Sequence, residues 1–292
     1  MKATDIIREN FSIWHEELAR TQELALCQAR AMAPLLAETH RTSGGGIGAL
    51  KEAVQDLLGA AKESTVCGGL QGALERLSFC EAFLAAHPSF ADELMLSAEE
   101  SHPRSAPLRV ATMRATVFEH AKERLFPLLS GVETAYCNGF TELCEMLAQD
   151  AAALALLPIE NTAEGILRRS YDLLERFELH VACTVEVATP DGNLTRVALL
   201  YHGTAPTLPP IKHENILECR TESTDGKTLT ELLTVADACA MTLHRIDTLG
   251  GEDGELYEHL IFRTERNDLL FATYLALFIP RSVITAKYIH YN

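Results

Sequence analysis

The sequence is poor in several features that would indicate particular classes of protein. It has a single tryptophan, and aromatic residues make up 7% of the chain. No apolar run approaches the roughly 20 residues that a membrane-spanning helix needs. The N-terminus also lacks the apolar core of a signal peptide. We therefore expect no membrane association and a cytoplasmic protein.

Basic residues are also scarce. The chain of 292 residues has 25 Lys and Arg against 41 Asp and Glu, which gives a formal net charge of −16. A phosphate-binding surface needs clustered Lys and Arg, so we expect no nucleic-acid partner. The acidity is typical of a solvated surface.

Metal and disulfide motifs are missing too. The eight cysteines form no Cys-x-x-Cys pair, and the eleven histidines are dispersed. Such cysteines usually act as small buried hydrophobic residues. We therefore predict no metal site and no disulfide framework.

The pattern of apolar residues divides the chain into three predicted domains. Residues 1–105 show helical periodicity and form an N-terminal helical domain, which ends in the polar segment Ser97–Pro107. Residues 106–205 alternate short strands with helices, which is typical of parallel β-α-β units, and include a helix predicted over Glu164–Arg176. Residues 206–292 follow the order strand, helix, strand, strand, helix, strand, which is that of a ferredoxin-like fold. The fold class is thus α+β and multidomain.

A hairpin is predicted near the end of the middle domain. Thr-Pro-Asp-Gly-Asn at 189–193 is a tight-turn sequence between two β-rich runs. We expect Thr184–Val187 and Leu194–Leu199 to pair as antiparallel neighbours.

The most informative segment begins in an apolar run at Leu154 and continues as Pro-Ile-Glu-Asn-Thr at 158–162. A buried strand here delivers polar side chains to a sheet edge, where ligands bind in open α/β folds. The segment resembles the Pro-Ile-Glu-Asn-Ser/Thr motif of the prephenate dehydratase family. This resemblance implies one periplasmic-binding-protein-like α/β lobe and a substrate site that includes Glu160, Asn161, Thr162 and Gly165.

A second motif of that family, Thr-Arg-Phe, is similar to Thr195-Arg196-Val197. The resemblance implies that Thr195 donates a proton to the leaving hydroxyl of prephenate, while Arg196 with Asn161 positions a substrate carboxylate. The alternative is that Thr195 and Arg196 are merely the start of a strand.

Two departures from the family pattern concern the cleft. The family has a second lobe between the two motifs, whereas here only a five-residue turn separates the strands. The family's glycine-rich loop after the first strand is replaced by residues 112–118, in which Thr116 and Phe118 alone fit the pattern. The glycines that allow close approach to an anion are therefore missing.

The flanking domains resemble parts of related enzymes. Residues 206–292 resemble the regulatory ACT domain that closes many prephenate dehydratases, which implies L-phenylalanine as an effector near Gly226, Leu229 and Asp247. Residues 8–18 resemble the first helix of a chorismate mutase domain, although Arg8 is the only matching cation. A helical support or oligomerisation domain is the alternative.

The resemblance implies a prephenate dehydratase-like lyase of phenylalanine biosynthesis, which converts prephenate to phenylpyruvate, CO₂ and water with no metal or redox cofactor. The rival hypothesis is a non-catalytic regulatory or scaffolding protein of the same family that has lost the cleft. A residual chorismate mutase is a third. We also predict a homodimer, because the run Leu269–Ile279 is apolar enough to need cover on more than one side.

Overall fold

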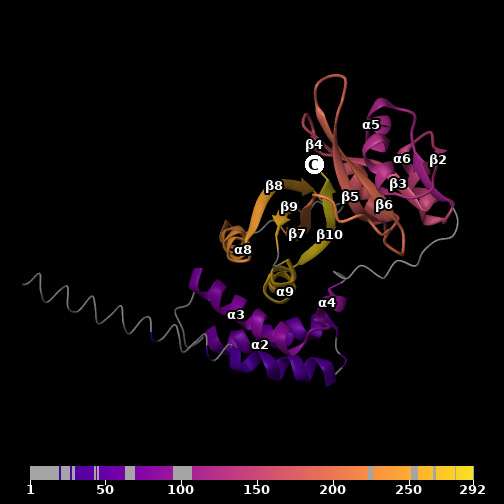
Figure 1. Ribbon diagram of the computed structural model, residues 1–292. Coiled ribbons are helices and arrows are strands. Elements are labelled where there is room, and N and C mark those ends of the chain that lie inside the picture. Colours follow the sequence, from indigo (N-terminus) through magenta and orange to yellow (C-terminus); the bar gives the residue numbers. More distant parts are fainter. Residues whose placement is uncertain are drawn as a thin grey trace, which may run out of the picture. The chain divides into compact units, whose positions relative to one another are not determined.

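The computed structural model describes residues 20, 27, 30–42, 44, 46–62, 70–94, 107–222, 226–250, 256–265, 268–279 and 281–291. The chain forms two compact units (Figure 1). The first comprises Met1–Leu96, Thr221–Ala240 and Arg266–Val283, and the second comprises Ser97–Arg220, Met241–Glu265 and Ile284–Asn292.

The second unit is built on one large mixed sheet with the strand order β2-β1-β3-β6-β5-β10-β7-β9-β8, and β4 pairs with β3. The lobe strands are β1 (Leu108–Thr112), β2 (Val132–Tyr136), β3 (Leu154–Asn161), β4 (Gly165–Ile166), β5 (His180–Ala188) and β6 (Leu194–Tyr201). The later strands are β7 (Glu214–Glu222), β8 (Met241–Gly250), β9 (Leu256–Thr264) and β10 (Ser282–Tyr291).

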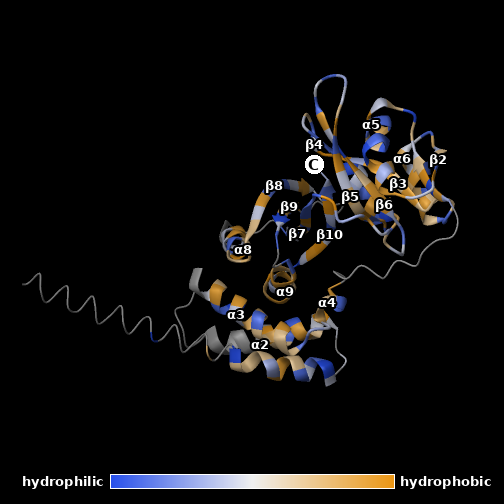
Figure 2. Ribbon diagram, in the orientation of Figure 1, coloured by the Kyte–Doolittle hydropathy of each residue, from blue (hydrophilic) through white to orange (hydrophobic). Residues whose placement is uncertain are grey.

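The parallel part of the sheet follows from the alternation of strands and helices. Strand β1 pairs in parallel with β2 and β3. The first six residues of β3 are buried, as expected for a strand covered on both faces. Figure 2 shows the hydrophobic colouring of β3 and β6.

Helices cover both faces of this part of the sheet. Helix α5 (Thr116–Leu125) buries Phe118, Ala121 and Leu125 in a core with alternate residues of β3 and β6. Helices α6 (Phe140–Ala148) and α7 (Arg168–Arg176) contribute to a second core that contains the other residues of the same strands. The helix predicted from Glu164 was wrong in its first turn, because Gly165–Ile166 pairs with β3 as strand β4 and α7 begins only at Arg168.

The predicted hairpin is confirmed. Strands β5 and β6 pair antiparallel from His180↔Tyr201 to Ala188↔Leu194. In the turn, the backbone N–H of Thr189 donates to the carbonyl oxygen of Asn193 at 2.8 Å, and Gly192 has a φ of +84°. Strand β5 therefore returns directly into β6.

The last four strands continue the sheet of the lobe. Strand β10 pairs in parallel with β5 through Ile289↔Cys183, His290↔Thr184 and Tyr291↔Val185. The order β10-β7-β9-β8, with helix α8 (Gly226–Ala238) after β7 and α9 (Asp268–Phe278) after β9, is that of a split β-α-β arrangement. The sequence predicted the order of these elements but not the continuous sheet.

The first unit is a group of helices. Helices α2 (Ile47–Lys62) and α3 (Leu70–Ala86) contact α9, and α3 also contacts α8. Arg76 of α3 bonds the Tyr274 hydroxyl at 3.0 Å and pairs with Glu231 at 2.7 Å. The short helix α4 (Phe90–Glu93) follows α3.

Helix α9 buries most of its apolar side chains and contacts α2 and α3 of the same unit. The run Leu269–Ile279 therefore has cover from α2 and α3 of the same chain, and the reason given for a dimer no longer requires a second copy. Residues 4–40 were predicted as one helix. Residues 30–42 are helical, whereas Arg8 and its neighbours lie outside the described residues.

Two further predictions concern the chain as a whole. None of the helices within the described ranges is long and apolar enough to cross a membrane. The cysteines at 80, 137, 144, 183, 219 and 239 are buried free thiols, as predicted, whereas Cys27 is exposed. Burial raises the pKa of the Cys183 thiol to about 12, so this side chain stays neutral.

Candidate functional site

The carboxyl ends of β1 and β3 lie at one edge of the sheet, where the Asn161–Gly165 turn begins. The side-chain oxygen of Asn161 accepts hydrogen bonds from the backbone N–H groups of Ala163 at 3.0 Å and Glu164 at 2.6 Å. The Thr162 hydroxyl accepts one from the backbone N–H of Leu194 at 3.0 Å. These bonds fix the turn against the start of β6.

The two sequence motifs meet in register on β3 and β6. Asn161 is opposite Thr195 and Glu160 is opposite Arg196, after a bulge between Pro158 and Glu160. Neighbouring residues of a strand point to opposite faces of the sheet. Asn161 and Thr195 therefore share one face, while Glu160 and Arg196 share the other. The predicted cooperation of Arg196 with Asn161 at one substrate carboxylate does not fit this alternation.

Pro158 explains why the bulge lies where it does. A proline has no N–H to donate within a sheet and is found at edges or bulges. The carbonyl oxygen of Pro158 instead accepts a hydrogen bond from the Ser170 hydroxyl at 2.6 Å, which ties α7 to β3. Without the bulge, Glu160 would not stand opposite Arg196.

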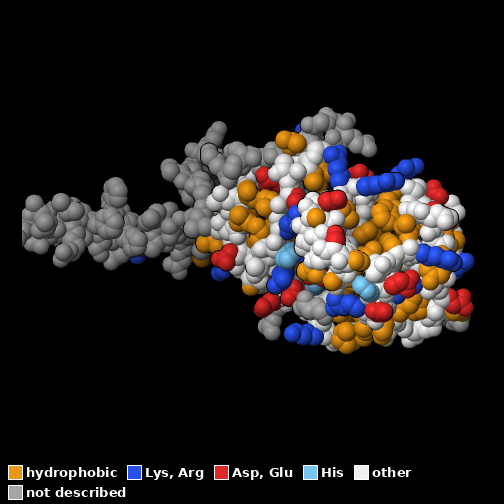
Figure 3. All heavy atoms as spheres, turned by 90° about the horizontal axis from the view of Figure 1, so that it is seen from above, with side chains coloured by type: hydrophobic (Ala, Val, Ile, Leu, Met, Phe, Trp, Pro, Cys, Tyr) orange, Lys and Arg blue, Asp and Glu red, His pale blue; other side chains and the backbone are white. Residues whose placement is uncertain are grey.

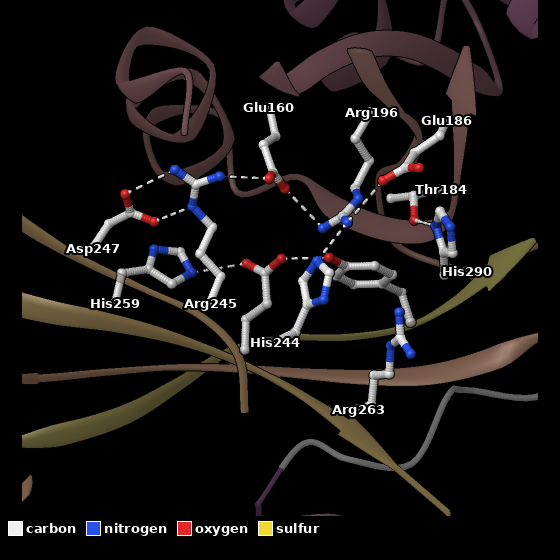
Figure 4. Close-up of polar contacts among 12 residues, drawn as sticks. Glu160, Thr184, Glu186, Arg196, His244, Arg245, Asp247, His259, Arg263 and His290 are labelled. Carbon is white, nitrogen blue, oxygen red and sulfur yellow. Dashed lines mark hydrogen bonds and ion pairs between the residues drawn. The ribbon is translucent and has the colours of Figure 1, made fainter. Parts of the chain in front are cut away.

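Arg196 is the centre of a buried network of charges (Figure 4). Its guanidinium pairs with Glu160 at 2.8 Å and with Glu186 at 3.2 Å. It also donates to Nε2 of His244 at 2.9 Å. Only 5% of the arginine side chain is exposed. Burial alone would lower the pKa of Arg196, but the nearby Tyr288, Glu160 and Glu186 outweigh it and raise that pKa, so Arg196 stays charged.

Arg245 extends this network along β8. It pairs with Glu160 at 2.7 Å and binds Asp247 with two guanidinium nitrogens. Gly165 leaves room for the Arg245 guanidinium, because a Cβ at residue 165 would lie 2.3 Å from Nη2 of Arg245. Gly165 also has a φ of +80°, which favours glycine. The network thus joins four residues that the sequence singled out separately: Glu160, Gly165, Arg196 and Asp247.

A second buried cluster surrounds Glu218 of β7. Nε2 of His259 donates to its carboxylate at 3.0 Å, and the hydroxyls of Tyr171 and Tyr288 donate to the same group. Burial raises the pKa of a carboxyl, but the bonds from His259 and both tyrosines outweigh burial and lower the pKa of Glu218. The cluster therefore holds a buried carboxylate.

Sequence reasoning did not single out Glu186, His244, Arg245, Glu218 or His259. Arg245 and Asp247 are two positions apart on one strand, so they share a face, and this opposite-charge spacing is a signal that the sequence does contain. The contacts of Arg245 with Glu160 and of His244 with Arg196 join residues about 50 to 85 positions apart, so no local pattern in the sequence indicates them.

Thr116 lies at the first turn of α5, next to the end of β1. Arg114, two residues before Thr116, is exposed, and its guanidinium lies 4.7 Å from the centre of the Tyr136 ring at the end of β2. Because β1, β2 and β3 are parallel, Arg114 stands at the same sheet edge as Asn161. No motif in the sequence indicated Arg114 as a site residue.

The predicted effector residues lie in different parts of the chain. Gly226 and Leu229 belong to α8 in the first unit, whereas Asp247 belongs to β8 in the second. A shallow surface hollow of about 450 Å³ lies elsewhere, beside α5, and is lined by Glu119, Lys122, Glu123, Phe126, Pro127 and Thr134. None of the predicted site residues is among its lining residues. On the face shown in Figure 3, acidic and basic side chains are interspersed with apolar ones.

Comparison with known proteins identifies the lobe. Residues 114–190 match the family model of prephenate dehydratase. This part of the chain is similar to prephenate dehydratases. Over 91 residues it is 34% identical to arogenate dehydratase/prephenate dehydratase 2, chloroplastic, of Arabidopsis thaliana, covering 30% of this chain and 23% of the relative. Over 83 residues it is 36% identical to arogenate dehydratase 2 of Petunia hybrida, covering 28% of this chain and 20% of the relative.

The fold of the chain is also similar to that of a solved structure. The prephenate dehydratase of Streptococcus mutans aligns with a TM-score of 0.51 at 18% identity, covering 63% of this chain and 98% of that chain. The alignments to the curated plant relatives span only about a fifth of those proteins. The family resemblance of the Pro-Ile-Glu-Asn-Thr segment is confirmed, since that segment lies within the matched residues.

Proposed function

We propose that this prephenate dehydratase-like chain dehydrates and decarboxylates a prephenate-type substrate at the edge of the sheet formed by the ends of β1, β2 and β3. The observation that carries the proposal is the direct opposition of Asn161 and Thr195, one from each family motif. Both plant relatives are named as arogenate dehydratases, so arogenate is the second substrate to assay.

The reaction needs a donor for the leaving hydroxyl and fixed groups for the carboxylates. Thr195 serves as the donor, so that the hydroxyl leaves as water while the ring carboxylate leaves as CO₂. The amide of Asn161 and the Asn161–Gly165 turn, which contains Thr162, orient the ring of the substrate. Arg196 acts as a positioning residue, because Glu160 and Glu186 already bind its guanidinium.

A substrate carboxylate also requires a cation. Arg114 is exposed at this edge and precedes the first turn of α5, where backbone N–H groups and the helix dipole favour anions. We assign the carboxylate that remains in the product to Arg114 and Thr116. This assignment takes the place of the predicted role of Arg196.

The remaining expectations belong to the same proposal. The strand order of β7–β10 supports an ACT-like regulatory module that binds L-phenylalanine through the region of Gly226 and Leu229. Asp247, bound to Arg245, connects that module with Glu160 of the lobe. A cytoplasmic homodimer with three domains, at 1–105, 106–205 and 206–292, completes the hypothesis.

Phenylpyruvate formation by the purified chain tests the proposal directly. Thr195→Val keeps the side-chain shape and removes the donor, so kcat should fall by about 10²–10⁴-fold. Thr134→Val is the matched control, because Thr134 is exposed on β2. Equal rates for wild type and Thr195→Val would refute the role of Thr195.

A non-catalytic regulatory protein is the second candidate. It is favoured by the tight β5–β6 hairpin, which stands where the family resemblance places a second lobe, and by the internal ion pairs of Arg196. An exposed edge also stabilises charge less than a closed cleft does. Absence of turnover, together with calorimetric binding of L-phenylalanine by the intact chain, would favour this candidate.

A further inference from the structure

Two histidines and a glutamate of the first unit converge outside the lobe. His40 lies in the helical segment 30–42, His87 directly follows α3, and Glu93 ends α4. One ligand atom from each of the three lies within 4.8 Å of the other two. Because His40 and His87 are separated by 46 residues, the spacing in the sequence gives no sign of this group.

The side chains of the group approach one another to near the spacing of metal ligands, although His40 contributes Nδ1 to one of the shortest distances and Nε2 to another. Nδ1 of His40 is 3.2 Å from Nε2 of His87, Nε2 of His40 is 3.5 Å from a Glu93 oxygen, and Nε2 of His87 is 3.6 Å from the other. Zinc binds nitrogen and oxygen at about 2.0–2.2 Å in a tetrahedron, which separates the ligand atoms by roughly 3.3–3.6 Å. Charge-assisted hydrogen bonds are shorter, about 2.7–2.9 Å.

The surroundings orient His87 for ligation. The Ser89 hydroxyl is 3.2 Å from Nδ1 of His87, so the other ring nitrogen, Nε2, faces His40 and Glu93. Such a bond to the second nitrogen is the usual way to orient a metal-binding imidazole. The fully buried rings of Phe83 and Phe90 pack against the histidines and hold them in place.

Burial and ligand type indicate the class of metal. His40 is 6% and His87 2% exposed, whereas the Glu93 side chain is 35% exposed and leaves a route for an ion. Imidazole with carboxylate suits Zn²⁺ and related transition metals, whereas Mg²⁺ and Ca²⁺ prefer oxygen alone. We propose that His40, His87 and Glu93 form a zinc-class site that fixes segment 30–42 to α3 and α4, with a fourth position left for water.

The test uses the untagged, full-length protein after chelator treatment. Zn²⁺ titration by calorimetry should give one site per chain, and Zn²⁺ should raise the melting temperature. Glu93→Gln should weaken Zn²⁺ binding by about tenfold or more. Glu38→Gln is the matched control, since Glu38 lies on segment 30–42 with its carboxylate on exposed Arg41, and it should bind like wild type.

Co²⁺ gives a second readout that does not depend on stability. The wild type and Glu38→Gln should show the intense visible absorption of a four-coordinate ion, and Glu93→Gln should lose it. Equal Zn²⁺ affinities and Co²⁺ spectra for wild type and Glu93→Gln would overturn the site. Binding without a rise in melting temperature would overturn the role in fixing the three segments.

Discussion

Replacing Glu160 by Gln should destabilise the second unit strongly. Glu160 joins Arg196 and Arg245, and the change leaves both cations with one fewer anionic partner. Arg196 is 5% exposed, so water cannot compensate its charge. Breaking a buried ion pair costs about 3–5 kcal/mol, and we expect about 3 kcal/mol here because Glu186 and Asp247 remain. Glu175→Gln is the control. Its carboxylate pairs with Arg220 at 3.4 Å and is 70% exposed, so the loss should stay below about 1 kcal/mol.

Urea unfolding followed by circular dichroism measures these changes. With an m-value of about 2–3 kcal/mol/M, the midpoint for Glu160→Gln should fall by roughly 1–1.5 M with m unchanged. The double variant Glu160→Gln/Arg196→Met removes both charges, so it should be more stable than the sum of the single losses implies. Strict additivity, or a loss for Glu160→Gln no larger than that for Glu175→Gln, would refute the argument that Arg196 is a buried charge held by Glu160.

Three other predictions use the same unit. Gly165→Ala should cost about 1–2 kcal/mol more than Gly192→Ala in urea unfolding, because both have positive φ but only Gly165 would meet the Arg245 guanidinium. Burial, with Arg196 nearby, lowers the pKa of His290 to about 4. The unfolded state therefore binds more protons than the folded state between pH 6.5 and 4. The free energy of unfolding should decrease as the pH is lowered through this window, and it should decrease less steeply in His290→Gln. If the chain is active, Arg114→Gln should raise KM about tenfold with little change in kcat, while Arg109→Gln, which changes an arginine near the other end of β1, should leave both unchanged.

Local patterns in the sequence predicted most elements of the lobe, because each depends on a signal within a few residues. The hairpin follows from turn residues between β-rich runs, and the parallel strands follow from their alternation with helices. Strand β4 was missed because two residues carry no periodicity. The pairing of β10 with β5 was also missed, since it joins residues about a hundred positions apart.

The sequence predicted which residues belong to the candidate site, but it did not predict which of them share a face of the sheet. Sequence reasoning treated Glu160, Asn161, Thr195 and Arg196 as one convergent group. The bulge after Pro158 and the alternation of strand side chains divide them into two pairs on opposite faces. No property of a single residue reveals such a division, because the register between two strands decides it.

This division places Glu160 and Arg196 on the face of the sheet that contacts β8. The face that carries Arg196 and Glu160 also contacts β8 through His244 and Arg245, so any ligand that shifts β8 acts on Glu160. Glu160 is adjacent in the chain to Asn161, whose partner Thr195 is the proposed donor. A change in the ion pair between Glu160 and Arg245 therefore occurs one residue away from Asn161 and the proposed reacting groups. If β8 carries a regulatory signal, Asp247→Asn should alter the response of turnover to L-phenylalanine more than turnover itself, as measured by phenylpyruvate formation with and without the amino acid. An unchanged response would separate this network from regulation.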